Sequence, residues 1–243
     1  MRVDLHSCFL LHKKAYRETS LLLEVFSKDY GRVGLVAKGA VTKKKLNQSL
    51  QPFMLLQIAW SGRSELGNLT CAEPDGMPVL LSGDKLFSGY YLNELLIRLL
   101  HRNDPHQGLF DVYQHIIEKL AITNSLESTL RLFEKKLLDE LGYGLILDHD
   151  IETGDVIKAD GIYDYIENNG PILISSARVK VKGVKVKGKT LLSLLSELDI
   201  EDKESRSEAK RLMRFLLAPL LGDRPLHSRR IFETMKTYKK EES

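Results

Sequence analysis

A glycine-rich stretch near residue 185 has residue types and a spacing that could bind a nucleotide. Gly183-Val-Lys-Val-Lys-Gly-Lys-Thr190 fits the phosphate-loop pattern, in which backbone amides surround the phosphates, the lysine neutralises them and the hydroxyl holds magnesium. However, Val184 and Val186 are β-branched and alternate with lysines as in a strand, and no parallel strand-helix-strand unit is evident around them. We interpret the match as accidental, and a phosphate-loop nucleotide hydrolase stays as an alternative.

Other residues with chemical potential are scattered. The seven histidines show no metal-ligand spacing, and Cys8 and Cys71 are too few for a structural zinc site or a disulfide framework. No nucleophile elbow of the G-x-S-x-G type is present. The sequence therefore predicts a binding protein that is not an enzyme and that needs neither metal nor cofactor.

The charge is segregated into two windows that contain no acidic residue. Removing their twelve cations from the 36 basic residues of the chain leaves 24, against 33 acidic residues. Cations gathered without acids repel one another, and a phosphate backbone is a common partner that neutralises them. The alternative is a basic face that is merely solvated. The cations are Arg32, Lys38, Lys43, Lys44, Lys45 and Arg63 in residues 30–64, and Arg178, Lys180, Lys182, Lys185, Lys187 and Lys189 in residues 168–196.

The composition is that of a globular protein. Of 243 residues, 43% are apolar and 28% are charged, which leaves enough apolar side chains for more than one core. The start of the chain lacks a secretory apolar segment, and no run approaches the roughly 18 apolar residues of a membrane span. We expect a soluble protein of the cytoplasm.

The elements that must position the basic residues change character along the chain. Five short strands with turn signals between them predict a small barrel, either an OB-fold or an SH3-like barrel. Leucines and aromatics then recur at helical spacing, and we expect these three helices to bury their stripes in a bundle. A hairpin follows around Asn169-Gly170, and helices resume to the end, with Pro219 expected to kink or end one of them and Ser228 to start the last. The expected strands are 8–12, 19–27, 32–38, 53–60 and 66–72, and the expected helices are 84–102, 108–121, 126–141, 190–198 and 207–217.

The predicted fold is therefore α+β: an N-terminal five-stranded OB-fold barrel, then an α-helical bundle domain with a small inserted β region. The expected domains are an OB-fold nucleic-acid-binding domain over 1–80, a helical bundle over 81–145 and 189–243, and a β insertion without zinc over 146–188.

Several segments in this order resemble the RecO family of bacterial recombination mediators. Four segments resemble its OB domain: Phe9-Leu-Leu-His12, Tyr16-Arg-Glu-Thr-Ser-Leu21, Val36-Ala-Lys-Gly-Ala40 and Leu50-Gln-Pro-Phe53. Four further segments resemble its helical domain: Tyr90-Tyr-Leu-Asn-Glu-Leu-Leu96, Leu130-Arg-Leu-Phe-Glu134, Leu141-Gly-Tyr-Gly-Leu145 and Pro225-Leu-His-Ser-Arg229. Some members carry a four-cysteine zinc module in the middle region, which has no cysteine here.

The resemblance implies a non-enzymatic helper of recombinational repair. Such proteins bind single- and double-stranded DNA, anneal complementary strands, pair with RecR, and help load RecA onto DNA coated by single-stranded DNA-binding protein. An RNA-binding OB protein remains a further alternative, because both partners present a phosphate backbone.

In that frame, Lys43, Lys44 and Lys45 are the first choice for phosphate contact. They follow Gly39 on an expected mobile loop, where long side chains can follow a strand without base selectivity. The second choices are Arg17, Arg32, Lys38 and Arg63, and a second DNA-binding strip is expected at Lys180, Lys182 and Lys185.

The resemblance also implies a receptor for the acidic, Phe-terminated tail of single-stranded DNA-binding protein in the helical domain. Arg131, in an apolar stripe, is the candidate for binding the terminal carboxylate. The alternative is a local ion pair with Glu134, one helical turn away.

Overall fold

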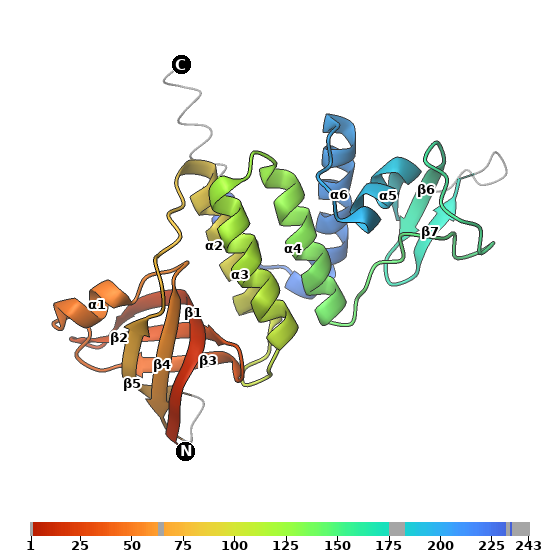
Figure 1. Cartoon of the computed structure of the whole chain (residues 1–243). Coiled ribbons are helices and arrows are strands. Elements are labelled where there is room, and N and C mark those ends of the chain that lie inside the picture. Colours follow the sequence, from red (N-terminus) through yellow and green to blue (C-terminus); the bar gives the residue numbers. More distant parts are fainter. Residues whose placement is uncertain (1, 63–65, 175–182, 232–233, 235–243) are drawn as a thin grey trace. The chain divides into compact units, whose positions relative to one another are not determined.

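The computed structural model describes residues 2–62, 66–174, 183–231 and 234, in two compact units. Unit 1 is Met1–Ile122 with Pro225–Ser243, and unit 2 is Thr123–Arg224. The predicted α+β class is confirmed, because a five-stranded barrel is followed by helices and a small three-stranded sheet (Figure 1). The predicted domain boundaries fall elsewhere than this division and stay predictions.

Unit 1 begins with the barrel, whose strands close in the order β1-β2-β3-β5-β4. All neighbouring strands are antiparallel except β3 and β5, which are parallel. The barrel predicted as an OB-fold is confirmed. Its elements are β1 (Arg2–Tyr16), β2 (Ser20–Ser27), β3 (Gly31–Ala37), the short helix α1 (Lys44–Ser49), β4 (Leu55–Ser61) and β5 (Leu66–Pro74).

The first strand is much longer than the predicted 8–12, because it pairs with β2 on one side and with β4 on the other. Its register shifts between Val3 and His6 and between Leu10 and His12, and such irregularities let one strand bend around a small barrel. Inward-facing aliphatic side chains fill the interior; Leu23, Val25, Leu35, Leu56 and Ile58 are fully buried.

Two further helices of unit 1, α2 (Gly83–Leu99) and α3 (Gln107–Ile122), pack against the barrel. The rings of Phe9 and Phe110 have centroids 5.3 Å apart. Behind them, the buried Tyr113 hydroxyl donates to Asn93 Oδ1 at 2.5 Å, and Asn93 Nδ2 donates to the Leu11 carbonyl at 3.0 Å. The expectation that these stripes are buried only among helices is therefore corrected, since the barrel buries part of α2 and α3.

The last segment of the chain returns to α2. The Glu94 carboxylate accepts the backbone N–H groups of His227 and Ser228 at 2.8 and 2.9 Å, and the Ser228 hydroxyl at 2.6 Å. A carboxylate is favourable at the positive end of a helix, and helical residues begin at His227. A helix is present here as predicted, but it begins at His227, so Ser228 lies within the first turn and is not the N-cap. Glu94, far away in the sequence, binds that first turn.

Unit 2 combines three helices with a small antiparallel sheet of order β7-β6-β8. Its elements are α4 (Leu126–Glu140), β6 (Ile162–Ile166), β7 (Gly170–Leu173), β8 (Val184–Lys187), α5 (Gly188–Ser196) and α6 (Lys203–Leu221). The predicted hairpin is confirmed, and Gly170 has the positive φ of +123° that its turn requires. The Asp202 side chain begins α6 by accepting from Ser205 N–H at 2.8 Å, and the helix continues past Pro219 to Leu221.

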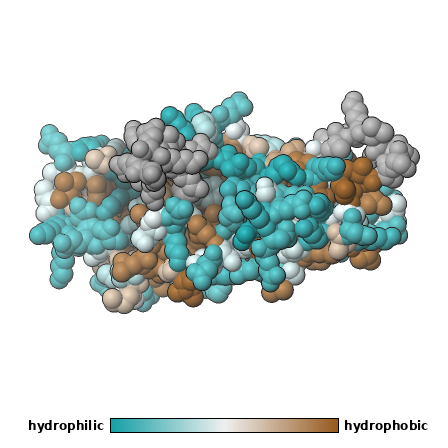
Figure 2. Space-filling model, turned by 90° about the horizontal axis from the view of Figure 1, so that it is seen from above, coloured by the Kyte–Doolittle hydropathy of each residue, from teal (hydrophilic) through white to brown (hydrophobic). Residues whose placement is uncertain are grey.

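The surface is mixed. On the face that Figure 2 shows, hydrophilic side chains cover most of the area, with hydrophobic ones between them. Among the described residues, no helix is both long and apolar enough to cross a lipid bilayer.

Candidate nucleic-acid interface

Five cations of the first window and its neighbourhood are carried by two adjacent loops at the barrel. The chain leaves β3 through Gly39, whose φ of +67° turns it back, and Lys43 N–H donates to the Gly39 carbonyl at 3.1 Å. The neighbouring β1–β2 turn is joined to this loop, because Val41 N–H donates to the Thr19 carbonyl at 3.0 Å. We call the resulting surface the basic rim; it consists of Arg17, Lys38, Lys43, Lys44 and Lys45.

The side chains of the basic rim are exposed. Within the described ranges, no hydrogen bond or ion pair holds any of its four lysine ammonium groups, and the Arg17 guanidinium lies 5.2 Å from the centroid of the Tyr16 ring. The tyrosine face can also stack a base, so Arg17 and Tyr16 offer a charge and a ring at one place. The charge of the four lysines is therefore not neutralised by an ion pair within the described part of the chain.

The predicted mobile loop is corrected in one respect, because Lys44 and Lys45 begin the helix α1. Leu46 packs against the barrel core, and Leu50, which follows the helix, is fully buried. These two apolar anchors fix a segment whose outer side is cationic. A short helix therefore holds two of the three expected phosphate ligands in a defined place.

Lys13, on β1, holds the other end of α1. Its Nζ donates to the Leu50 carbonyl at 2.8 Å and to Asn47 Oδ1 at 3.3 Å, and burial lowers the pKa of this lysine. A cation is favourable at the negative end of a helix, whereas Lys44 and Lys45 occupy the positive end, with no acid in the first turn. Lys13, at the negative end of α1, thus offsets part of the electrostatic cost of placing Lys44 and Lys45 at its positive end. Sequence reasoning missed Lys13; the Lys13-Lys14 pair just before Tyr16-Arg17 is the signal that could have found it.

Arg32, an expected phosphate ligand, already has partners within the chain. Its Nε donates to the Leu100 carbonyl at 3.0 Å, and its Nη1 lies 3.4 Å from Glu24 Oε2. The other oxygen of Glu24, Oε1, pairs with Arg102. Burial lowers the pKa of Arg32, and only 17% of its side chain is exposed. Arg32 therefore holds the barrel to the end of α2, and a phosphate would have to compete with Glu24 for it, so its DNA contact stays a prediction.

The second basic window is only partly described. Lys180 and Lys182, like Arg63 of the first window, lie outside the described residues. Lys185 is exposed on β8, whereas Lys187 lies 2.6 Å from Glu204. Lys189 lies 3.2 Å from Asp202 and 3.5 Å from Glu204, and the hydrogen bond that it donates to Asp202 raises the pKa of this lysine. Acids therefore neutralise two of the three described lysines of the second window, Lys187 and Lys189, and leave Lys185 of the predicted strip exposed.

The phosphate-loop pattern does not form a loop. Val184–Lys187 are a strand antiparallel to β6, and a methyl group on Gly188 would lie 1.9 Å from the Lys158 carbonyl oxygen. The Thr190 hydroxyl donates to the buried Glu208 carboxylate at 2.7 Å. The second glycine, the lysine and the hydroxyl all have packing roles here, which argues against the nucleotide hydrolase alternative.

Neither cysteine thiol is activated as a nucleophile, because the pKa of each is raised. Burial raises the pKa of Cys8 to about 12, and burial, with the Glu73 carboxylate, also raises the pKa of Cys71. In the described part of the chain, no group of three or more His, Cys, Asp or Glu side chains is placed to hold a metal ion.

Comparison with known proteins accounts for both halves of the chain. The family model "Recombination protein O N terminal" matches residues 1–76, and "Recombination protein O C terminal" matches residues 80–230. The chain belongs to the RecO family. Proteins named DNA repair protein RecO are 46% identical in Nitrosococcus oceani, 45% in Coxiella burnetii and 44% in Dechloromonas aromatica. These alignments cover 97%, 95% and 97% of this chain, and 95%, 98% and 97% of the relatives.

Membership of the RecO family confirms the resemblance and makes this chain a DNA repair protein. The two family models meet between residues 76 and 80, close to the predicted end of the barrel domain. The basic rim lies wholly in the half that matches the N-terminal RecO model.

Arg131, the predicted receptor for an acidic peptide tail, lies in the half that matches the C-terminal RecO model. It is buried on α4, and its Nη2 lies 2.5 Å from Glu134 Oε1. The local ion pair is therefore present, and only 7% of the Arg131 side chain is exposed. A peptide carboxylate would have to compete with Glu134 for this guanidinium, so the receptor role stays a prediction.

Proposed function

We propose that this chain is a non-enzymatic recombination mediator. It binds single- and double-stranded DNA, promotes annealing of complementary strands, and helps load RecA onto DNA coated by single-stranded DNA-binding protein. Its partners are DNA, RecR and the C-terminal tail of single-stranded DNA-binding protein, and it works in the cytoplasm at the nucleoid.

The observation that carries the proposal is the basic rim on the barrel. Its cations are exposed, no described acid pairs with its lysines, and two of them, Lys44 and Lys45, lie on a helix anchored by Leu46, Leu50 and Lys13. Such a surface follows a phosphate backbone without reading bases, which is what a protein acting on any damaged sequence requires. Annealing adds a second demand, because two strands must be neutralised as they approach one another.

A titration of fluorescent single-stranded DNA at several salt concentrations tests the binding step. Five phosphate contacts from the basic rim should give a slope of about −3.5 in log K against log salt, since each contact on a single strand contributes about −0.7. A slope near zero would contradict the proposal. Stronger binding of structured RNA at equal salt would favour the RNA-binding alternative.

The mediator step is tested with complementary strands that have been coated with single-stranded DNA-binding protein. The protein should accelerate their annealing without ATP, and adding RecR should speed the assembly of RecA on the coated strand. Binding without any acceleration would reduce the proposal to DNA binding alone.

The partner peptide is tested by fluorescence anisotropy with the acidic, Phe-terminated tail. Arg131→Ala should weaken its binding by about 1.5 to 3 kcal/mol while leaving DNA affinity nearly unchanged, because a charge-assisted hydrogen bond is lost. Equal affinity of the wild type and the variant would leave Arg131 as the structural partner of Glu134 only.

A further inference from the structure

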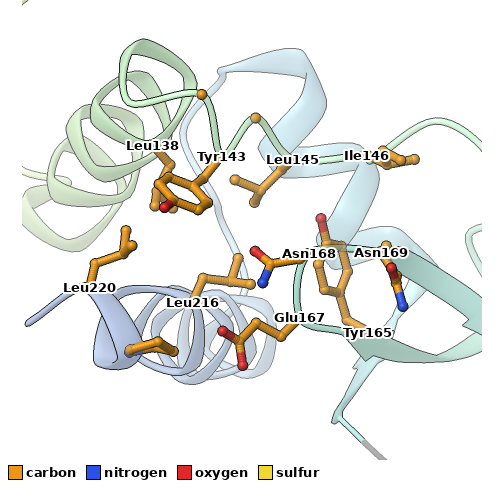
Figure 3. A pocket seen from close by; sticks show the side chains of 14 residues that line it. Leu138, Tyr143, Leu145, Ile146, Tyr165, Glu167, Asn168, Asn169, Leu216 and Leu220 are labelled. Atoms are coloured by element: carbon orange, nitrogen blue, oxygen red, sulfur yellow. The ribbon is translucent and has the colours of Figure 1, made fainter. Parts of the chain in front are cut away.

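Unit 2 contains a cavity of about 560 Å³ that the proposed function does not use. Three segments of unit 2 line it: the end of α4 with the chain that follows, the β6–β7 turn, and the last turns of α6 (Figure 3). We call it the hairpin pocket. Its volume lies within the roughly 300–1,000 Å³ of sites that bind small ligands or a few side chains.

The walls of the hairpin pocket are held in place without a ligand. Beyond α4, Gly142 has a φ of +83°, and Tyr143 N–H donates to the Leu138 carbonyl at 2.8 Å. On the opposite wall, a methyl group on Gly170 would lie 3.2 Å from Ile146 Cβ, so the turn is pressed against the segment that follows α4. Burial raises the pKa of Tyr165, whose hydroxyl meets the Ile146 backbone N–H. A preformed site loses little entropy when a ligand orders it.

One part of the wall is apolar and another is rich in acceptors. Figure 3 shows leucines of α4 and α6 on one side, while Glu167 and Asn168 reach from the turn toward Leu216. Glu167 is the sole Lys, Arg, His, Asp or Glu residue of the lining, and its carboxylate has no partner among the described residues. Asp139 is close by, because a methyl group on Gly144 would lie 3.2 Å from its Oδ1. The described residues therefore give the pocket a negative charge, in a protein that is basic overall.

We propose that the hairpin pocket binds a peptide segment in which a lysine or arginine is next to a bulky apolar residue. The apolar side chain packs against Leu138, Leu216 and Leu220, and the cation meets the Glu167 carboxylate. An acidic peptide is disfavoured, because it would bring a second negative charge to Glu167. This partner differs in chemistry from the acidic tail considered for Arg131, and its binding does not depend on the DNA-binding proposal.

The test uses the full chain and two labelled synthetic peptides, acetyl-Gly-Leu-Arg-Leu-Gly-amide and its twin with Glu in place of Arg. In fluorescence anisotropy at low salt, the Arg peptide should bind at least about tenfold more tightly than the twin, because one is attracted and the other repelled. Glu167→Gln should weaken the Arg peptide by about three- to tenfold, because it removes the charge of a half-buried carboxylate. Glu201→Gln, an exposed acid of unit 2 outside the lining, is the matched control and should change nothing.

Three outcomes would overturn the proposal. These are equal binding of the two peptides, equal effects of Glu167→Gln and Glu201→Gln, and no saturable binding of the Arg peptide. Chemical-shift mapping supplies the location: the Arg peptide should move the backbone signals of residues 142–146 and 167–170 rather than those of the basic rim. Preferential binding of the acidic tail at these same residues would assign the hairpin pocket to the opposite chemistry.

Discussion

The two basic windows of this chain have the same charge but different surroundings. Each carries six cations and no acid. In the first, the lysines of the basic rim are exposed, and no described acid pairs with them. In the second, Lys187 and Lys189 are paired with Asp202 and Glu204, which lie just beyond the window and return beside it at the start of α6. Whether a run of cations is available to a polyanion therefore depends on the acids that the fold brings back to it.

Removing the lysines of the first window should have the largest effect. Lys43→Ala, Lys44→Ala and Lys45→Ala together should flatten the slope of log K against log salt for single-stranded DNA by about two units. The matched triple variant at Lys185, Lys187 and Lys189 should change it by no more than about 0.7, since only Lys185 lacks an acidic partner among the described residues. Equal losses in the two variants would erase the distinction between the windows.

Removing the acids that pair with the second window should make its lysines available to DNA, as the lysines of the basic rim are. Asp202→Asn with Glu204→Gln releases Lys187 and Lys189, and asparagine can still begin the helix. If both lysines then reach phosphates, the slope steepens by about 1.4 units. The control is Glu201→Gln with Asp223→Asn, which makes the same change in net charge at exposed positions of unit 2. A steepening of the same size in this control would mean that net charge alone, and not the release of two lysines, is responsible.

Lys13 and Lys14 provide a sharper comparison within the first window's surroundings. Both are lysines of β1, but Lys13 is bound to the end of α1, whereas Lys14 is exposed. Lys13→Met should raise amide hydrogen exchange in residues 44–50 and tryptic cleavage after Lys43 to Lys45 severalfold, and Lys14→Met should leave both unchanged. DNA affinity should fall further for Lys13→Met, because the phosphate ligands lose their fixed position. The same protection in both variants would show that Lys13 does not position α1.

The smallest expected effect is a pH dependence of stability caused by Asp202, one of the acids that pair with lysines of the second window. The Ser205 backbone N–H, with Lys189 nearby, lowers the pKa of Asp202 to about 2. A lowered pKa in the folded state means that this stabilisation is present above the unfolded value of about 3.9 and is lost as the pH falls through about 2. The group is exposed, so the contribution should stay below about 1 kcal/mol.

Urea unfolding of the wild type and of Asp202→Asn between pH 7 and pH 2 measures this contribution. The difference in free energy of unfolding should be constant above pH 5 and should change only between about pH 4 and pH 2. Parallel curves throughout would mean that Asp202 has the same pKa in both states.

Much of this architecture can be predicted from periodicity and turn residues. The five strands, the helices and the hairpin at Gly170 follow from local patterns, because each pattern reports which face of a segment is buried. The length of β1 and the helix α1 do not follow. The ends of β1 are fixed by pairing with β4, about 50 residues away, and α1 is held by two apolar anchors and a lysine on another strand. Local sequence carries neither constraint.

The candidate site could be predicted only in part, for the same reason. The lysines of the basic rim can be recognised in the sequence as part of a run without acids. The pairing of Arg32 with Glu24 and with the Leu100 carbonyl cannot, because it depends on tertiary contacts. The pairing of Lys187 with Glu204 likewise joins residues 17 positions apart through the β8–α6 packing. The sequence indicates which residues are charged, and the fold decides which of them remain available.

The bond between Glu94 and the first turn of the last helix also has a consequence for biosynthesis. Its partners are more than 130 residues apart, and all of unit 2 lies between them in the sequence. During translation, the barrel and α2 leave the ribosome first. His227 and Ser228, which bind Glu94, are made only after the whole of unit 2. Until then, Glu94 is a carboxylate without its N–H donors, and the nascent barrel unit is one segment short of its finished structure.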